Sequence, residues 1–200
     1  MQQRSDEWFA ARLGKVTASR IPDVMARTKS GYGAGRKNYM AELLVERLTG
    51  QREESYINAA MQHGIDTEDE ARMAYEFSRE LVEEVGFVEH PTIAMSGASP
   101  DGLVGEDGEV EIKCPNTATH LETLLSKAVD RRYVLQMQWQ MACTGRQWCD
   151  FVSYDPRLPE RQAIVVIRVA RDESLIAEIT REVVLFLEEL DALEAQVRAA

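Results

Sequence analysis

The densest group of residues that could do chemistry lies between positions 99 and 113. Ser99-Pro100-Asp101-Gly102 is followed, ten positions after the aspartate, by Glu111-Ile112-Lys113. If the second segment is a β-strand, Glu111 and Lys113 share one face and Ile112 points into the core, because side chains alternate along a strand. A hairpin between the segments can fold Asp101 back against Glu111. The spacing therefore predicts two carboxylates and an ammonium group at one point.

Two converging carboxylates suit a hard divalent cation, which takes oxygen ligands from side chains, backbone carbonyls, water and phosphate. We expect Asp101, Glu111 and the backbone carbonyl of Ile112 to hold Mg²⁺, one or two ions per site, with Mn²⁺ able to substitute. Such a metal would lower the pKa of a water and offset charge on a phosphorus under attack, and Lys113 would orient or deprotonate that water. The alternative is a solvent-facing cross-strand ion pair.

Glu68 could supply a further oxygen ligand from a helix. In the segment His63-Gly64-Ile65-Asp66-Thr67-Glu68, Gly64 and Glu68 lie one helical turn apart, so the glycine would let a metal or a DNA backbone approach closely. Taken alone, Glu68 also fits a solvated helix face among neighbouring acids. His63 could be a metal ligand, or a histidine that is exposed or satisfied by a partner.

Residues near the N-terminus are of the types that hold a phosphate. Arg12 offers a bidentate fork to phosphate oxygens, and Ser19, in the first turn of an expected helix, adds a hydroxyl and backbone N–H donors. Gln136 could add an amide from another helix. Each has a structural alternative: Trp8 as a core residue, Arg12 in a surface ion pair, and Gln136 as an ordinary polar helix position.

Charge is distributed unevenly along the chain. The net charge of −11 argues against a protein that coats DNA through bulk positive charge. Residues 1–52 nevertheless hold ten Lys or Arg against five Asp or Glu, and basic residues gather between Arg12 and Lys37. If DNA binds, this segment, including Lys29, should touch it. The alternative is a solvated basic face without a ligand.

Periodicity and turn signals predict the elements that must position these residues. We expect helices over 5–13, 17–25 with Thr17 as its cap, 39–50, 58–80 opened by Asn58, 117–127, 131–144, and from 172 towards the C-terminus. We expect strands over 81–89, 92–95, 103–104, 109–113, 147–154 and 162–169, and a glycine-rich loop over 30–35. The fold class is therefore α/β or α+β, one domain over 1–200 with a central mixed sheet flanked by helices.

The cysteine count and the hydropathy pattern exclude some protein classes. Cys114, Cys143 and Cys149 form neither an even disulfide framework nor a paired metal motif, so we expect them to be reduced and buried. Three cysteines cannot hold a four-cysteine iron–sulfur cluster, which disfavours a helicase-linked nuclease module of that kind. No segment resembles a signal peptide or a membrane span, so we expect a cytoplasmic protein with no membrane partner.

The order of these motifs resembles the phage lambda exonuclease and YqaJ-type viral recombinase family, within the PD-(D/E)XK nuclease superfamily. The motifs are E-W-x₃-R-x-G-x-x-T-A-S at 7–19, G-x₃-E at 64–68, S-P-D-G at 99–102, E-I-K-C-P at 111–115 and Q-x-Q at 136–138. Five motifs in this order are far more specific than any one of them. The resemblance implies a restriction-endonuclease-like core.

The resemblance also implies an activity: a Mg²⁺-dependent 5′→3′ exonuclease that degrades linear double-stranded DNA processively to mononucleotides and leaves 3′ single strands for annealing recombination. Asp101, Glu111 and the Ile112 carbonyl would bind Mg²⁺, Glu68 would assist, and Lys113 would position the attacking water. The resemblance implies that Arg12, Ser19 and Gln136 hold the 5′-terminal phosphate. We expect Trp8, Ser99 and Lys29 to contact the DNA as well. Similar enzymes are toroidal homotrimers, act with a single-strand annealing protein, and come from phages or prophages in the bacterial cytoplasm.

The chain departs from the family pattern at several positions, and other functions stay open. His63 stands where the family has tryptophan, Met61 where an apolar strand-separating wedge is expected, and Thr119 or His120 at a basic position. One alternative is a structure-specific or sequence-specific endonuclease on the same core, which would cut closed circular DNA. Another is a catalytically silent DNA-binding protein, which the complete set of acidic and lysine residues disfavours.

Overall fold

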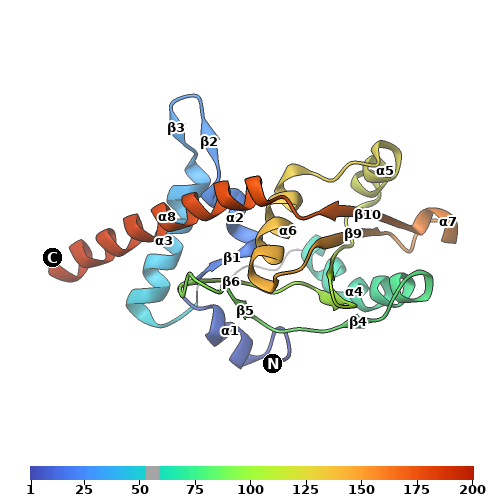
Figure 1. The fold of residues 1–200 in the computed structure, drawn as a ribbon, viewed down its shortest axis with the longest axis horizontal. Coiled ribbons are helices and arrows are strands. Elements are labelled where there is room, and N and C mark those ends of the chain that lie inside the picture. The colour runs from blue at the N-terminus through green and yellow to red at the C-terminus, as the bar shows by residue number, and fades with distance from the viewer. Residues whose placement is uncertain (53–58) are drawn as a thin grey trace.

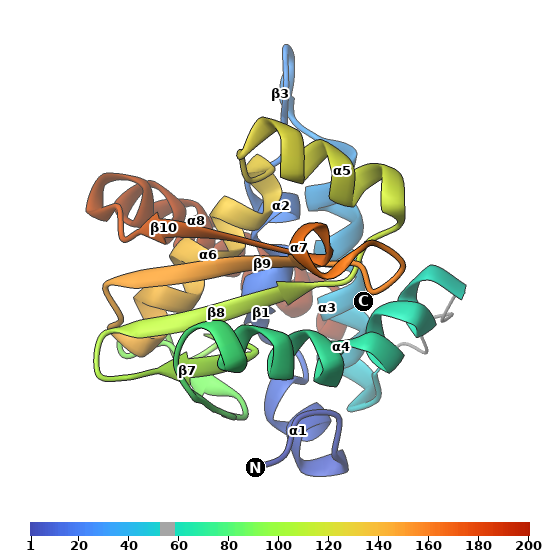
Figure 2. The ribbon, with the colours of Figure 1, turned by 90° about the vertical axis from the view of Figure 1, so that its right-hand side faces the viewer.

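The computed structural model describes residues 1–52 and 59–200. A five-stranded mixed sheet lies at its centre, in the order β10-β9-β8-β7-β4, with helices on both faces (Figures 1 and 2). Its strands are β4 (Val82–Glu83), β7 (Gly102–Val104), β8 (Gly108–Lys113), β9 (Trp148–Tyr154) and β10 (Ile164–Ala170). Strands β8 and β9 are parallel and the other neighbours are antiparallel. The predicted fold class is confirmed.

Two helices pack against opposite faces of this sheet. Tyr75 of α4 (Ala59–Ser78) belongs to the same hydrophobic cluster as Ile112 of β8. Met141 of α6 (Arg131–Thr144) clusters instead with Phe151 of β9. Because side chains of β8 alternate, Ile112 faces α4 while Glu111 faces α6. The strand therefore holds an acidic side chain on one face and seals the core with the other.

A second, three-stranded sheet connects the N-terminal region to the central sheet. Strand β1 (Val16–Thr17) pairs in parallel with β6 (Ser96–Ala98), which also pairs with β5 (Val88–Glu89). Gly97 permits this close packing, since a Cβ there would lie 2.3 Å from the Phe87 ring and 2.6 Å from the Val88 carbonyl oxygen. Because β6 ends directly before Ser99, the pairing brings helix α1 (Asp6–Arg12) beside Ser99.

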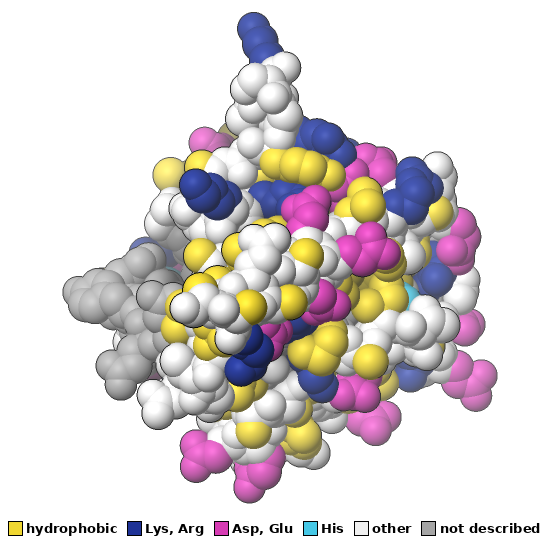
Figure 3. Space-filling view, turned by 90° about the vertical axis from the view of Figure 1, so that its left-hand side faces the viewer, with side chains coloured by type: hydrophobic (Ala, Val, Ile, Leu, Met, Phe, Trp, Pro, Cys, Tyr) yellow, Lys and Arg dark blue, Asp and Glu magenta, His cyan; other side chains and the backbone are white. Residues whose placement is uncertain are grey.

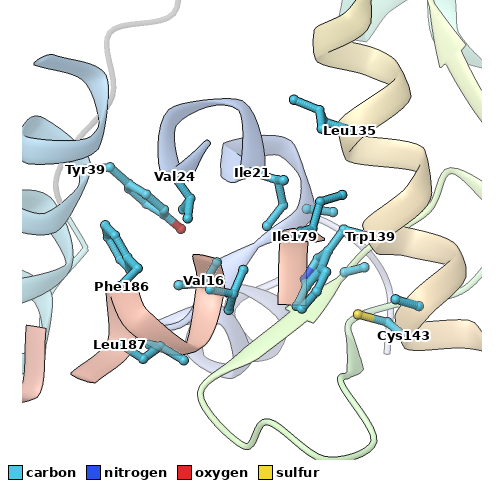
Figure 4. Close-up of a cluster of buried hydrophobic side chains, with 14 of the residues drawn as sticks. Val16, Ile21, Val24, Tyr39, Leu135, Trp139, Cys143, Ile179, Phe186 and Leu187 are labelled. Atoms are coloured by element: carbon cyan, nitrogen blue, oxygen red, sulfur yellow. The ribbon is translucent and has the colours of Figure 1, made fainter. Parts of the chain in front are cut away.

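A hydrophobic cluster beside this second sheet holds it against the helices (Figure 4). Side chains from α2 (Ile21–Val24), α3 (Ala34–Thr49), α6 and α8 (Glu173–Ala199) contribute to it. Tyr39 of α3 stacks on Phe186 of α8, with ring centroids 5.5 Å apart. Trp139 of α6 is fully buried and donates its indole N–H to Ser96 Oγ at 3.1 Å, which ties α6 to β6.

Most of the predicted helices are confirmed, with ends that shift by a few residues. They are α1, α3, α4, α5 (Thr117–Ser126), α6 and α8. Gly50 and Gly145 follow α3 and α6 in the left-handed conformation, as expected of helix-ending glycines. Asn58, the expected first residue of the fourth helix, lies outside the described residues. None of the described helices is both long enough and apolar enough to span a membrane.

Two predictions about the N-terminal third hold only in part. The segment expected to be helical over 17–25 is helical over 18–24, as the short 3₁₀ turn η1 (Ala18–Arg20) and α2, but Thr17 ends strand β1 and makes no capping hydrogen bond. The 30–35 segment is not simply a loop, because β3 (Gly31–Tyr32) pairs with β2 (Arg27–Thr28) and α3 begins at Ala34. The resulting hairpin projects from the body of the molecule (Figure 1). At both places the pairing of short strands, β1 with β6 and β2 with β3, determined the local structure.

Three strand predictions also need correction. The single strand expected over 81–89 is two short strands, β4 and β5, which belong to different sheets. The segment 92–95 is not a strand, and β6 begins after it. Strand β10 begins at Ile164 because the helical turn α7 (Glu160–Ala163) occupies the residues before it. Local β propensity does not reveal which partner a strand finds, so it could not separate these cases.

Candidate active site

Glu111 lies at the centre of a group of hydrogen-bond donors. Its side chain is 1% exposed and accepts a hydrogen bond from Lys113 Nζ. Gln136 Nε2 donates to Glu111 Oε1 at 2.6 Å, and Gln140 Nε2 donates to Oε2 at 2.5 Å. The two amides lie one turn apart on α6 and hold both carboxylate oxygens in place. The prediction that Glu111 and Lys113 share one face of the strand is confirmed.

Asp101 reaches the same strand from the turn that precedes β7. Its Oδ2 accepts the backbone N–H of Ile112 at 2.6 Å. Burial is the main cause that raises the pKa of Asp101 to about 8, and repulsion from Glu111 adds to it. Burial alone would lower the pKa of Lys113, but the attraction of Glu111 and Asp101 outweighs it and raises that pKa. Lys113 is therefore a stable ammonium group between two carboxyl groups.

This cluster of Asp101, Glu111 and Lys113 fits a divalent cation. Two carboxyl groups meet a single lysine here. Burial is the larger cause of the raised pKa of Asp101, and repulsion from Glu111 adds to it; a cation would relieve that repulsion. Within residues 1–52 and 59–200, no three His, Cys, Asp or Glu side chains gather closely enough to hold a metal by themselves. Asp101, Glu111 and the Ile112 carbonyl would therefore form a partial coordination shell, open to water or phosphate oxygens.

Glu68 lies beside the cluster but is already engaged by arginine. Arg4 Nη2 donates to Glu68 Oε2 at 2.6 Å, and Arg72 Nη2 lies 3.8 Å from Oε1. Glu68 and Asp101 line one hollow of about 380 Å³. Glu68 also lines a second hollow, of about 650 Å³, together with Lys113. The role of Glu68 as an assisting metal ligand remains a prediction.

Arg4 is a residue that the sequence motifs did not reveal. It lines both of the hollows that meet at Glu68. A single arginine in an irregular segment has no motif or periodicity, so only the folded chain could place it at the site.

A third hollow, of about 400 Å³, lies beside α1, and Trp8, Arg12 and Ser19 line it. The Arg12 guanidinium stacks on the Trp8 ring, 4.0 Å from its centroid. Both side chains donate to Ser99 Oγ, Trp8 Nε1 at 2.9 Å and Arg12 Nη1 at 3.2 Å. Burial lowers the pKa of Arg12 to about 10, so Arg12 is still a cation at neutral pH. Ser99 links this hollow to Asp101, two residues further along.

Two glutamates also line the third hollow, and each already accepts hydrogen bonds. Arg20 Nη1 donates to both carboxylate oxygens of Glu42, at 2.9 and 2.8 Å. Glu46 accepts the backbone N–H of Gly14 at 2.8 Å. Arg12, by contrast, forms no ion pair within the described ranges. The hollow is therefore electrostatically suited to an anion next to Arg12.

Gln136 and Lys29 do not join Arg12 in the structure. Gln136 is bound to Glu111, so it lies at the carboxyl cluster and not in the lining of the third hollow. Lys29 lies at the exposed turn of the β2–β3 hairpin, whose tip carries a basic side chain in Figure 3. The Met61 side chain, the expected wedge, lies outside the described part of the chain. The roles of these residues towards DNA remain predictions.

The basic segment near the N-terminus is largely neutralised by acidic residues from elsewhere. Lys15 pairs with Glu89 at 2.5 Å, and Arg36 pairs with Glu189 at 2.5 Å. Arg27 pairs with a glutamate of α8 as well. Basic and acidic side chains are interspersed on the face shown in Figure 3. The positive excess in the sequence therefore does not become a broad positive surface there.

The His63 and His120 rings and the three cysteine thiols lie in different environments. His63 Nδ1 lies 3.3 Å from Thr67 Oγ1, one turn along α4. His120 is fully buried, with Nδ1 2.8 Å from Ser153 Oγ and Nε2 2.8 Å from the Gln162 carbonyl oxygen, so it cannot replace a basic DNA contact. The three cysteines are free thiols; two are buried and Cys114 is half-buried. Burial raises the pKa of Cys114 to about 12.

Metal binding should strengthen as the pH rises towards 8. Asp101 must lose its proton before it can bind a cation, so Mg²⁺ affinity should fall by about tenfold for each pH unit below the raised pKa. Calorimetric titration of the DNA-free protein with Mg²⁺ at pH 6.5, 7.5 and 8.5 would measure this. Asp101→Asn is the control, because it lacks both the proton and the carboxylate, so its Mg²⁺ binding should be weak at every pH. An affinity that is the same at all three pH values would contradict the prediction.

Solved structures of exonucleases are similar to this chain. The alkaline exonuclease LHK-Exo from Laribacter hongkongensis is 57% identical, with a TM-score of 0.91 over 98% of this chain and 97% of that chain. LHK-Exo in complex with dAMP gives a TM-score of 0.92, with the same identity and coverage. A phage related exonuclease from Haemophilus somnus 129PT, 19% identical with a TM-score of 0.75 over 92% of this chain and 96% of that one, shares the fold. Among curated proteins none matches significantly.

The family comparison covers most of the residues that build the site. Residues 7–147 match the YqaJ-like viral recombinase domain. This span includes nearly all of α1 with Arg12, the Ser99–Asp101 turn, strand β8 and helix α6, but not Arg4. The chain therefore belongs to the family of YqaJ-like viral recombinase domains.

Proposed function

We propose that this protein is a Mg²⁺-dependent exonuclease that degrades linear double-stranded DNA processively from 5′-phosphorylated ends. It would release mononucleotides and leave 3′ single strands. Membership of the family, with 57% identity to an alkaline exonuclease over nearly the whole chain, makes the protein a deoxyribonuclease. The metal, the direction and the processivity belong to the proposal. The relative in complex with dAMP supports a nucleoside monophosphate as product.

The observation that carries the proposal is the position of Ser99. Its hydroxyl accepts hydrogen bonds from Trp8 and Arg12, and two residues later Asp101 contacts strand β8. The hollow beside Arg12 and the carboxyl cluster are thus held together by one short turn. An enzyme that cuts only at strand ends needs such a pair of sites, one for the terminal phosphate and one for the bond that breaks.

The residues of the chain have separable roles in this scheme. Asp101, Glu111 and the Ile112 carbonyl would hold Mg²⁺, which when bound lowers the pKa of a water and offsets negative charge on the phosphorus. Lys113 would orient the attacking water from the face that it shares with Glu111. Arg12 would bind the terminal phosphate, because a guanidinium donates two parallel hydrogen bonds to phosphate oxygens.

Assembly and partners form a further part of the proposal. A toroidal homotrimer around the duplex would keep the enzyme on its substrate, and a single-strand annealing protein would take up the 3′ strand. Both rest on the family resemblance. The apolar side chains of Met73, Phe77 and Leu81, which are largely exposed on and just after α4, are candidates for burial in such contacts.

The proposal predicts cleavage that depends on a DNA end. The purified protein with Mg²⁺ is incubated with linear duplexes labelled at either end, bearing 5′-phosphate or 5′-hydroxyl, and with supercoiled circles. The phosphorylated strand should be lost from its 5′ end, and chelation of Mg²⁺ should stop the reaction. Intact circles should survive. Cutting of circles would favour the endonuclease alternative, and no cleavage of any substrate would favour a silent DNA-binding protein.

Arg12→Ala gives the same assay a test of the phosphate hollow. The preference for 5′-phosphate over 5′-hydroxyl should fall by about tenfold or more, since hydrogen bonds to charged groups contribute roughly 1.5–3 kcal/mol. Arg198→Ala is the control, because Arg198 is an exposed arginine that, among the described residues, forms an ion pair only with Glu194 on the same helix, α8. An unchanged preference in Arg12→Ala would place the terminal phosphate elsewhere.

A further inference from the structure

The segment before α1 is anchored next to the carboxyl cluster. Gln3 Nε2 donates to the carbonyl oxygen of Val85 at 2.8 Å and to that of Pro100 at 2.7 Å. On the other side, Ser5 Oγ accepts the backbone N–H of Trp8 and caps α1. Pro100 directly precedes Asp101. Arg4 is therefore held between two anchored residues, one of which is tied to the turn that carries Asp101.

The backbone of Arg4 has a conformation that is unfavourable for any residue with a side chain. Its φ angle is +66°, in the left-handed region where a residue with a Cβ is uncommon and glycine is unstrained. A non-glycine residue kept in this region requires surroundings that hold it there, and such residues gather at functional sites. The conformation of Arg4 therefore indicates that its side chain has a function at this position.

The Arg4 guanidinium lies where the two hollows of the carboxyl cluster meet. It donates to Glu68 Oε2 at 2.6 Å, and its side chain is 49% exposed. One hollow contains Asp101, and the other contains Ile112 and Lys113. A cation and Arg4 would thus compete for the same carboxylate, at the edge of the space that a DNA strand must enter.

A second arginine also pairs with Glu68 but has other acidic partners. Arg72 lies 3.8 Å from Glu68 and 4.0 Å from Asp69, and it forms an ion pair with Glu84. Arg4 has Glu68 as its only ion-pair partner within the described ranges. If a cation takes the Glu68 carboxylate, Arg72 keeps a partner but Arg4 loses its own. The freed guanidinium would remain beside Lys113, able to meet a phosphate.

We propose that Arg4 binds a phosphate of the DNA, and that Glu68 keeps it in an ion pair until a divalent cation binds to Glu68. In the metal-free protein Arg4 pairs with Glu68. When the cation engages Glu68, Arg4 turns to a phosphate of the DNA strand next to the bond that breaks. The inference rests on the proposed function, and it makes metal binding and DNA binding mutually supportive through one side chain.

Arg4→Gly is the sharpest variant, because glycine accepts the positive φ angle while the guanidinium is lost. Its melting temperature should be no lower than that of the wild type. Two measurements avoid catalysis: Mn²⁺ binding to DNA-free protein, followed by electron paramagnetic resonance, and binding of a 5′-phosphorylated duplex in Ca²⁺. Arg4→Lys keeps the charge without the fork, and Arg198→Ala is the control for loss of an exposed paired arginine.

The two measurements should move in opposite directions. Mn²⁺ should bind Arg4→Gly about two- to fivefold more tightly, because a competing exposed ion pair of modest strength is gone. The duplex should bind roughly tenfold more weakly, because a charged phosphate contact is lost. Arg4→Lys should lie between the wild type and Arg4→Gly in duplex binding, and Arg198→Ala should match the wild type in both assays.

The outcomes separate this inference from the proposed function. If the wild type digests linear DNA but Arg4→Gly matches it in Mn²⁺ and duplex binding, this inference alone is overturned. A drop in melting temperature with both affinities weakened would also overturn it, because it would show a structural role. If the wild type binds Mn²⁺ and the duplex but degrades no DNA, the proposed function fails, while opposite shifts in Arg4→Gly would still support the competition.

Discussion

Replacing Asp101 by asparagine should abolish DNA hydrolysis and, at the same time, stabilise the metal-free protein. The loss of activity should be at least about 10³-fold, since a catalytic metal contributes several kcal/mol of charge stabilisation and asparagine is a poor ligand for it. The amide oxygen can still accept the Ile112 N–H that Asp101 accepts at 2.6 Å. The fold should therefore survive the change.

The gain in stability follows from the direction of the Asp101 pKa shift. Burial and the charge of Glu111 raise the pKa of Asp101 in the folded protein to about 8, from its ordinary value of 3.8. The folded state thus keeps a proton that the unfolded state releases, so the free energy of unfolding falls as the pH rises from about 4 to about 8. Asparagine carries no such proton and avoids this loss.

Urea unfolding of both proteins with a chelator, at pH 4.5, 6.5 and 8.5, measures this effect. The variant should be favoured by an amount that grows with pH, reaching on the order of 1–3 kcal/mol at pH 8.5. Saturating Mg²⁺ should reverse the order at pH 8.5, because it stabilises only the protein that binds it. A variant that is less stable than the wild type at every pH would show that the Asp101 carboxylate is held by contacts other than those described.

Replacing Lys113 by methionine should lower turnover by about 10²–10⁴-fold, the range in which a positioned proton-transfer group acts. Methionine keeps the apolar stem and removes the ammonium group that donates to Glu111. Glu111 remains oriented by Gln136 and Gln140. Binding of duplex DNA in Ca²⁺ should therefore change much less than turnover.

Single-turnover cleavage and Ca²⁺-supported duplex binding separate the two effects in Lys113→Met. Glu111 loses its cationic partner, so some loss of stability is expected as well, moderated because the Lys113 side chain is 28% exposed. Lys113→Arg restores the charge and should recover stability more fully than turnover. Turnover near that of the wild type in Lys113→Met would show that Lys113 only balances the charge of Glu111.

Local pattern in the sequence determined the chemistry of the cluster. Alternation along one short strand placed Glu111 and Lys113 on the same face and Ile112 in the core, and the hairpin expected between the two segments is present as β7 and β8. These inferences hold because strand geometry has a period of two whatever surrounds it. The ends of α3 and α6 at Gly50 and Gly145 could also be predicted locally, because the left-handed conformation that follows a helix favours glycine whatever surrounds it.

Contacts between distant segments were decided only by the tertiary structure. The parallel pairing of β1 with β6 brings Arg12 to Ser99, 87 residues away, and the same packing separates β4 from β5. Gln136 donates a hydrogen bond to Glu111, and Arg36 near the N-terminus forms an ion pair with Glu189 of α8.

The carboxyl cluster could therefore be predicted from the residues at positions 101–113, whereas its surroundings could not. Pairing energy depends on which surfaces meet, and the sequence of either partner alone does not contain that information. Arg4 is the clearest case: no motif marks it, and only the anchoring of Gln3 beside Asp101 carries it to Glu68.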